Sequence, residues 1–260
     1  MDLSSLTEEN ANRWNRANLT RGPEFARVAQ RLFKAKARYK AVEKATGIPW
    51  FVIAVIHERE SSQKWDASLA QGDPWDEVST HVPRGRGPFN SWEDAAIDAL
   101  KKCPPYAAKW KDWSAGGTMT LLEQYNGLGY SKRGLPSPYV WSGTDQYKTG
   151  KYVADGAFDP GVVDRQLGCA GLILGLKALD PSITFTGEKA PPPPDVEPVP
   201  KTKPAVESKT IWAQIGTILA SIGGLLASDW KVVAVVIVAA LAAFVIWDRA
   251  GKPDIRGWFK

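Results

Sequence analysis

PWFVIAVIHERESS, residues 49–62, is the stretch that decides the fold of this chain. Proline is tolerated in the first turn of a helix, and the seven residues that follow Pro49 are all apolar. A helix that is apolar on every side has to be buried. We therefore predict a central, buried helix over residues 49–61 whose last turn carries the charged residues Glu58, Arg59 and Glu60.

The segments on either side predict a mainly α-helical, lysozyme-like domain over residues 1–186 with a small loop or hairpin lobe. Apolar residues recur at helical spacing, and Ser91 precedes acidic residues as a helix N-cap does. The other expected helices are 6–20, 23–44, 91–102, 118–126 and 162–179. Glycine and proline punctuate residues 66–90 and 127–161, so we expect loops there, with a short hairpin in 66–90.

The last part of the chain has a different composition. Prolines at 191–194, 198, 200 and 204 fall among charged residues, so 187–209 is predicted to be an extended linker. Residues 210–249 are almost wholly apolar, and Trp230 and Trp247 bracket a run without polar side chains. About 18 helical residues reach roughly 27 Å, which matches the hydrocarbon core of a bilayer. One or two transmembrane helices, 211–227 and 230–248, are expected, followed by a basic tail over 250–260.

Two spans would form a transmembrane hairpin, and basic residues at both of its outer ends would keep those ends cytoplasmic. A single span would leave the domain outside, with 211–227 lying in the interface as an amphipathic helix. Gly216, Ala220 and Gly224 suit close helix packing in lipid, which allows self-association. Residues 1–16 lack the apolar segment of a signal peptide.

Charge and cysteine content narrow the function classes. The net charge of +5 allows attraction to an anionic cell wall or nucleic acid, or reflects the basic flanks of the apolar tail. No nucleic-acid-binding motif is present, so no nucleic-acid partner is expected. Cys103 and Cys169 allow at most one bridge, and two buried thiols are favoured. With His57 and His81 the only histidines, no metal site and no cofactor are expected.

The charged end of the central helix is a candidate acid site. Partial burial raises the pKa of a glutamate and keeps it protonated, as a glycosidase acid requires. A helix end with solvated charges would have the same sequence. Helical spacing does not choose between Glu58 and Glu60.

Four segments in the same order resemble a lysozyme family of phages and prophages. Residues 56–62 resemble its His-x-Arg-Glu-Ser-Ser signature and, more distantly, the Glu-Ser pair of goose-type lysozymes and soluble lytic transglycosylases. Residues 71–75 correspond to Asn-Gly-Asp-Pro-Leu, 91–100 are close to the family pattern, and 125–130 lead into 137–143 as they do there. The resemblance covers about residues 25–175.

This resemblance implies a peptidoglycan glycosidase. Glu60, the glutamate before the serine, would protonate the oxygen of the β-1,4 link between N-acetylmuramic acid and N-acetylglucosamine, and Glu58 would be a variable neighbour. The best-known phage lysozymes place an aspartate nine residues and a threonine fifteen residues after the acid, where this chain has Leu69 and Trp75. The identity of a second catalytic residue is therefore open.

Candidates for that second role are Asp73, Asp66, Ser79 and Thr80. We favour Asp73 as a catalytic residue, because its glycine-proline turn would aim it across a cleft. A plain turn aspartate is the alternative. Without a second carboxylate nearby, inverting hydrolysis and lytic cleavage by the sugar's own 6-hydroxyl both stay open.

Aromatic and amide side chains over residues 125–152 are candidates for sugar binding. Aromatic faces suit sugar rings, and an asparagine can hydrogen-bond an acetamido group. Tyr125 and Asn126 match the Tyr-Asn of the wider transglycosylase-like pattern. The full set of expected substrate-binding residues is Tyr125, Asn126, Tyr130, Trp141, His57 and Thr80. For most aromatics of this loop, the alternative is that they only pack it.

Together these features predict a membrane-anchored glycosidase of a phage or prophage lysis system. Its expected partners are bacterial peptidoglycan and the host's inner membrane, and it would act on the periplasmic wall. A chitinase-like enzyme of the same superfamily is one alternative. A holin-like membrane protein whose soluble domain only binds glycan is another.

Overall fold

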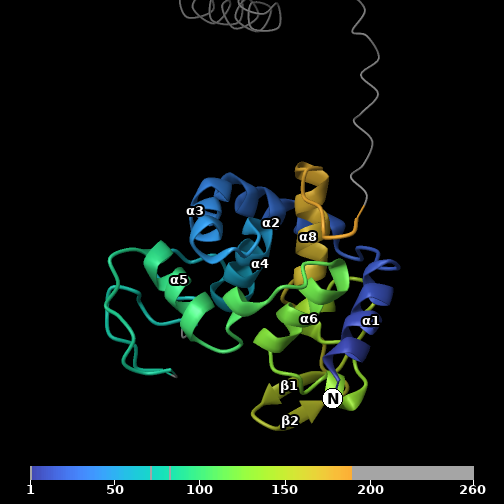
Figure 1. Cartoon of the computed structure of the whole chain (residues 1–260). Helices are drawn as coiled ribbons and strands as arrows, with labels where there is room; N and C mark the ends of the chain where they lie inside the picture. The colour runs from blue at the N-terminus through green and yellow to red at the C-terminus, as the bar shows by residue number, and fades with distance from the viewer. Residues whose placement is uncertain (1, 71, 82, 189–260) are drawn as a thin grey trace, which may run out of the picture. The chain divides into compact units, whose positions relative to one another are not determined.

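The computed structural model describes residues 2–70, 72–81 and 83–188, which form a mainly α-helical unit with one small hairpin (Figure 1). The helices are α1 (Leu3–Trp14), α2 (Gly22–Lys34), α3 (Lys36–Thr46), α4 (Trp50–Ser61), α5 (Trp92–Lys102), α6 (Ala115–Tyr125), α7 (Pro138–Trp141) and α8 (Cys169–Leu179). The strands are β1 (Lys151–Ala154) and β2 (Ala157–Asp159), and short 3-10 turns occupy Ala107–Lys109 and Ser131–Arg133.

The expected transmembrane helices and basic tail, and all of the linker after residue 188, lie outside the described residues. Within the part of the chain that the structure describes, no helix is both long and apolar enough to cross a membrane.

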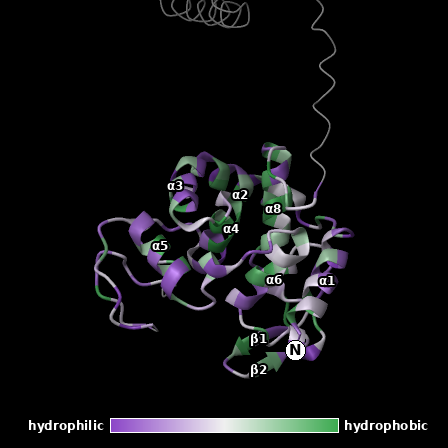
Figure 2. Cartoon of the chain, in the orientation of Figure 1, coloured by the Kyte–Doolittle hydropathy of each residue, from purple (hydrophilic) through white to green (hydrophobic). Residues whose placement is uncertain are grey.

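The helix over residues 50–61, α4, is the central element, as its sequence predicts. Every side chain from Trp50 to His57 is buried, with at most 5 % of its surface exposed. Helices α2, α3 and α8 pack around α4, and α1 packs along α6 (Figure 1). Figure 2 shows that α8 is largely hydrophobic, while α3 carries hydrophilic residues on its surface. Burial of the first two turns of α4 fixes the position of its charged last turn.

Helix caps explain where the observed helices differ from the predicted ranges. The Asp2 side chain accepts a hydrogen bond from the Ser4 amide, so α1 starts before residue 6. Ser114 caps α6 in the same way, and Ser91 caps α5 as predicted. The helix predicted over 23–44 is divided at Ala35, whose φ and ψ of −93° and 8° interrupt the helical path.

Residues 162–168 are not helical, which corrects the predicted helix over 162–179. Asp164 binds side chains from other elements there, and Gly168 has an extended backbone, so α8 begins at Cys169. Cys103 and Cys169 are free and buried, as expected.

The hairpin lies at residues 151–159, whereas 66–90 was the expected place. β1 and β2 are antiparallel, with Lys151 opposite Asp159 and Tyr152 opposite Phe158. The rings of Tyr130, Tyr152 and Phe158 pack edge to face with centroids 5.0–6.2 Å apart, which gives this hairpin an apolar side. The described part of 66–90 is a loop with a single isolated bridge, between Ala67 and Pro74.

Candidate active site

Glu60 lies in the last turn of α4, where the buried helix meets solvent. The hydroxyl of Tyr139, from α7, donates a hydrogen bond of 2.6 Å to Glu60 Oε1. The neighbouring charges of α4 point elsewhere, because Glu58 pairs with Arg31 and Arg59 pairs with Asp164. The side chains of Glu58, Arg59 and Glu60 therefore make their contacts on three different sides of α4.

The pKa of the Glu60 carboxyl is raised. Desolvation by the surrounding protein is the main cause, while the Tyr139 hydrogen bond and the charge of Arg59 act in the opposite direction. The side chain as a whole is exposed, so water reaches it from one side while protein encloses it from the other. A carboxyl group in this position stays protonated to higher pH than a free glutamate and remains accessible to a ligand.

Tyr139 is a fixed donor. Its side chain is buried, with 4 % of its surface exposed, and the guanidinium of Arg59 lies over its ring, 4.7 Å from the centroid. Burial is also the main cause that raises the pKa of Tyr139, with the nearby Glu60 charge adding to it, so the hydroxyl stays protonated and donates.

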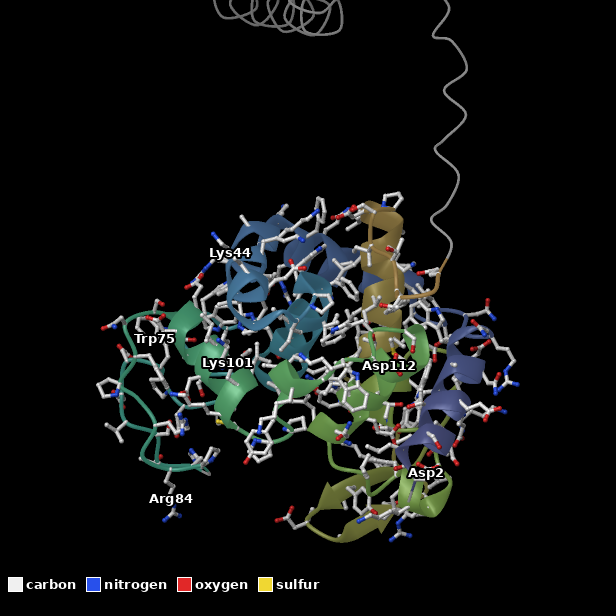
Figure 3. All side chains as sticks on the ribbon, in the orientation of Figure 1. Asp2, Lys44, Trp75, Arg84, Lys101 and Asp112 are labelled. Atoms are coloured by element: carbon white, nitrogen blue, oxygen red, sulfur yellow. The ribbon has the colours of Figure 1, made fainter. Side chains whose placement is uncertain are left out.

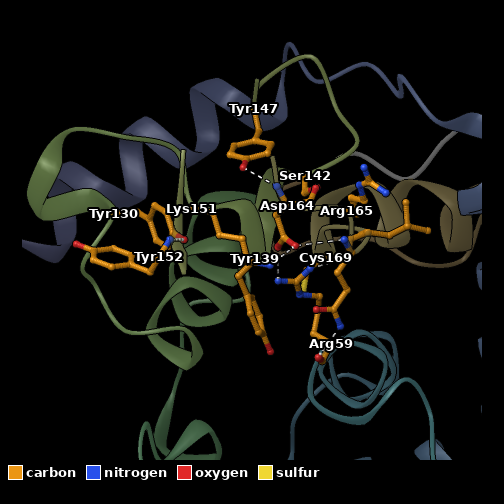
Figure 4. A network of polar contacts seen from close by, with 12 residues as sticks. Arg59, Tyr130, Tyr139, Ser142, Tyr147, Lys151, Tyr152, Asp164, Arg165 and Cys169 are labelled. Atoms are coloured by element: carbon orange, nitrogen blue, oxygen red, sulfur yellow. Dashed lines mark hydrogen bonds and ion pairs between the residues drawn. The ribbon is translucent and has the colours of Figure 1, made fainter. Parts of the chain in front are cut away.

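A buried ionic network holds Arg59 in turn (Figure 4). Asp164 accepts from Arg59 Nη2 at 3.2 Å and from Lys151 Nζ at 2.9 Å. Burial opposes ionisation of Asp164, but the two cations hold its pKa below the usual value. The Tyr147 hydroxyl accepts from the Asp164 amide at 3.0 Å. The network connects the end of α4, strand β1 and the segment before α8.

A groove of about 640 Å³ opens beside this network. It runs between the end of α4, the end of α6, the start of α7 and the hairpin. Its lining comprises Arg59, Asn126, Gly129, Tyr130, Pro138, Lys151, Tyr152, Val153, Ala154, Asp155, Gly156, Asp164 and Gln166. Glu60 and Tyr139 do not line it themselves, but their direct chain neighbours Arg59 and Pro138 do, so the groove lies next to the two segments that carry the acid and its donor. Its walls combine aromatic rings with amide and charged groups, as sugar-binding sites do.

The structure brings three of the predicted binding residues to this region. Asn126 is exposed and lines the groove. Tyr130 also lines the groove but is only 4 % exposed, and its hydroxyl accepts from the Tyr152 amide at 2.9 Å. Tyr125 is partly buried; burial is the main cause of its raised pKa, with the nearby Glu60 charge adding to it. These residues come from the end of α6 and the loop that follows.

Trp141 and His57 lie in the core, which corrects the expectation that they bind substrate. Trp141 is 0 % exposed and its Nε1 donates to Asn10 at 3.3 Å. His57 is also 0 % exposed, and both of its ring nitrogens have partners. Neither side chain can contact a ligand in the groove.

The partners of His57 define its protonation. Nε2 donates to the Lys64 carbonyl at 2.7 Å, and Nδ1 accepts from the Tyr39 hydroxyl at 3.0 Å, which itself accepts from Gln63. Burial lowers the pKa of His57 to about 4, so the ring is neutral at neutral pH. The histidine of the signature holds the end of α4 in place.

Asp73 organises its own loop. Its Oδ2 accepts from the Thr80 and His81 amides at 2.8 and 3.0 Å, and its Oδ1 binds the His81 ring. These bonds to His81 and Thr80 lower the pKa of Asp73. No hydrogen bond or ion pair joins Asp73 to Glu60, both of which are described. Three hydrogen bonds from Thr80 and His81 hold its carboxylate within the loop, so the turn-aspartate alternative describes Asp73 better than the catalytic one.

The other candidates for the second role share this loop with Asp73. Thr80 and Asp66 are exposed and Ser79 is buried. The amide of Ser79 bonds to the Arg86 carbonyl, and Arg86 forms a bidentate ion pair with Asp98 of α5 that fastens the loop. Figure 3 shows Trp75 and Arg84 on this loop, with Arg84 directed away from the body of the protein.

Tyr139, Asp164 and Lys151 were not singled out from the sequence as site residues. The Ser-Pro-Tyr segment that carries Tyr139 was visible as a motif, but nothing in it shows that the hydroxyl reaches Glu60. Glu123 of α6 was also missed; its carboxyl is only 2 % exposed, and burial raises its pKa to about 6. Among the described residues, no three His, Cys, Asp or Glu side chains gather as metal ligands.

Comparisons with protein-family models, with curated proteins and with solved structures find no match for this chain.

Proposed function

We propose that this chain is a glycosidase that cleaves the β-1,4 link between N-acetylmuramic acid and N-acetylglucosamine in bacterial peptidoglycan, with Glu60 as the general acid. The observation that carries the proposal is the pairing of Glu60 with Tyr139 at the end of a buried helix. Desolvation keeps the Glu60 proton in place, and the Tyr139 bond fixes its direction.

The groove beside Glu60 supports a polymeric sugar substrate. Asn126 supplies an exposed amide for an acetamido group, and the partly exposed ring of Tyr152, supported from behind by the buried ring of Tyr130, is available to a sugar ring. In this role Glu60 gives its proton to the leaving glycosidic oxygen as the bond to the anomeric carbon breaks. Tyr139 then stabilises the carboxylate that forms.

Lytic cleavage is the second candidate, and the bonds of Asp73 favour it. Hydrolysis with inversion needs a second carboxylate to activate water. Asp73, the best candidate from the sequence, is occupied by Thr80 and His81. In the lytic reaction the 6-hydroxyl of the muramic acid attacks its own anomeric carbon. This attack gives a 1,6-anhydro ring, and the proton given by Glu60 is replaced by the one lost from that hydroxyl.

The test is mass spectrometry of sugar fragments released from purified peptidoglycan by the wild-type chain and by Glu60→Gln. We expect Glu60→Gln to lower the rate by about 10²- to 10⁴-fold. Glu58→Gln, two residues away on another side of α4, serves as the matched control and should stay within about tenfold of wild type. Fragments with reducing ends would indicate hydrolysis, and fragments with 1,6-anhydro ends would indicate lytic cleavage.

Two outcomes contradict the proposal. Full activity of Glu60→Gln would exclude this residue as the acid. Cleavage of chitin oligomers but not of peptidoglycan would assign the chain to the chitinase-like alternative.

The second part of the proposal concerns delivery. The proline-rich linker and apolar tail would tether the enzyme to the inner membrane of the host, within reach of the wall. A variant that lacks residues 210–260 should retain activity on isolated walls and lose lysis of whole cells. Equal lysis by both forms would remove the tether from the proposal.

A further inference from the structure

A second, basic hollow lies on another side of α4. It has a volume of about 550 Å³ and is lined by Arg31, Lys34, Ala35, Ala37, Arg38, Ser62, Gln63 and Trp65. None of these residues lines the groove beside Glu60. All three charged residues of the lining are cations, so the hollow is positively charged where it faces solvent.

The two arginines of this hollow are held from behind by acids that do not line it. Arg31 donates to Glu58 at 2.6 Å and to Gln63 at 2.8 Å. The Arg31 side chain is 52 % exposed and that of Glu58 only 12 %, so the acid lies beneath the guanidinium. Arg31 is therefore oriented without being covered.

Arg38 is fixed in the same manner. Its Nε and Nη2 donate to Glu93 at 2.5 and 3.0 Å, and its guanidinium stacks on the Trp65 ring at 3.8 Å from the centroid. Its side chain is 42 % exposed, against 24 % for Glu93. In both Arg31 and Arg38, Nη1 makes no hydrogen bond to any described residue.

Lys34 is the third cation, and it is exposed. It makes no ion pair or hydrogen bond within the described chain, although every other cation of the lining does. Two preoriented guanidinium groups and one unengaged ammonium group, with no acid in the lining, present donors for an anionic oxygen group.

We propose that this hollow binds a carboxylate or phosphate group of an anionic cell-wall polymer and so holds the chain on its substrate apart from the groove. Naming the cell wall as the source rests on the proposed function. The chemistry of recognition rests on Arg31, Lys34 and Arg38 alone. Such contacts weaken as salt screens them.

The test measures binding of the full-length chain, carrying Glu60→Gln to prevent cleavage, to three preparations of cell-wall sacculi. The first keeps the peptide stems, the second lacks stems but keeps a phosphodiester polymer, and the third has neither. In the second and third, the lactyl carboxylates freed by removal of the stems are converted to neutral amides. Lys34→Gln is the main variant, because Lys34 has no partner whose loss could disturb the fold. Lys44→Gln, which removes an exposed lysine of α3 outside the hollow, is the matched control (Figure 3).

We expect Lys34→Gln to weaken binding about three- to tenfold at low salt, with no change for Lys44→Gln. Weaker binding of Lys34→Gln to the first preparation would identify stem carboxylates as the ligand. Weaker binding to the second would identify phosphate. Inorganic phosphate should compete with the sacculi for the wild-type hollow, and it should compete less well for that of Lys34→Gln. Arg31→Gln should have the same effect as Lys34→Gln, and Arg31→Lys should restore part of it.

The proposal is overturned if Lys34→Gln and Arg31→Gln bind all three preparations as Lys44→Gln does. It is also overturned if they lose binding equally on the preparation without stems or phosphate. Cleavage of that same preparation by the chain with Glu60 intact tests the glycosidase separately, since the hollow has no anion to bind there.

Discussion

The Tyr139 hydroxyl donates to Oε1 of Glu60 at 2.6 Å, although the two residues are 79 positions apart in the sequence. Both ends of this bond are held, Glu60 by the buried helix α4 and Tyr139 by burial beneath Arg59. The bond favours the ionised carboxylate, while desolvation favours the neutral one and prevails. Tyr139 is therefore expected to fix the direction of the acid and to limit the rise of its pKa.

Tyr139→Phe should shift the pH profile of cleavage. Removal of a donor that stabilises the carboxylate raises the pKa of Glu60 further. The acid must be protonated to work, so activity is lost as pH rises through this pKa. The alkaline limb of the kcat profile should therefore move to higher pH, while kcat itself falls by about ten- to hundredfold as the carboxyl loses its fixed direction.

Kinetics across a pH series measure this shift. Tyr106→Phe, at an exposed tyrosine, is the control and should leave the profile unchanged. An unshifted limb in Tyr139→Phe would show that this hydroxyl does not act on Glu60 in solution.

Asp73→Asn tests whether Asp73 stabilises its loop or takes part in catalysis. An asparagine cannot replace all the bonds that the Asp73 carboxylate accepts from Thr80 and His81, so the melting temperature should fall. Cleavage should drop by less than about tenfold, because loss of a catalytic base costs about 10²- to 10⁴-fold. A larger drop in kcat at an unchanged melting temperature would return Asp73 to the catalytic role.

His57 should make the domain less stable in acid. Burial lowers its pKa from 6.5 to about 4. Between these two pH values the unfolded state binds a proton at His57 and the folded state does not. Its contribution is complete above pH 6.5 and is lost as pH falls toward 4. We estimate this loss at about 3 kcal/mol.

Urea unfolding at several pH values tests this prediction with His57→Gln, whose amide cannot titrate. The difference in unfolding free energy between wild type and variant should shrink between pH 6.5 and 4. A difference that stays constant over this window would mean that His57 is not the group responsible.

Glu123 should have the opposite effect on stability. Burial raises its pKa from 4.5 to about 6, so the folded state favours the protonated form. Its contribution is present below pH 4.5 and is lost as pH rises through 6. Glu123→Gln should raise the unfolding free energy at pH 7 by about 1–2 kcal/mol relative to its effect at pH 4. Equal effects of the substitution at both pH values would contradict this assignment.

Local patterns determined the elements of the domain that carry their own signals. The apolar run after Pro49 predicts a buried helix wherever the rest of the chain lies, and Ser91 caps its helix by accepting from the Asp94 amide, three residues further on. The same patterns place Glu60 at a helix end. Helical periodicity and capping depend on neighbours within a turn or two, so one sequence suffices to read them.

Tertiary structure decided which groups surround Glu60. Tyr139 is 79 residues from it, and Asp164 is 105 residues from Arg59, so no local pattern could pair them. Tertiary packing also buries His57 in the core and directs the Asp73 carboxylate to Thr80 and His81 of its own loop. The protonation and direction of a side chain depend on burial and on donors brought from distant segments, and only packing of α4, α7 and the segment before α8 brings these together.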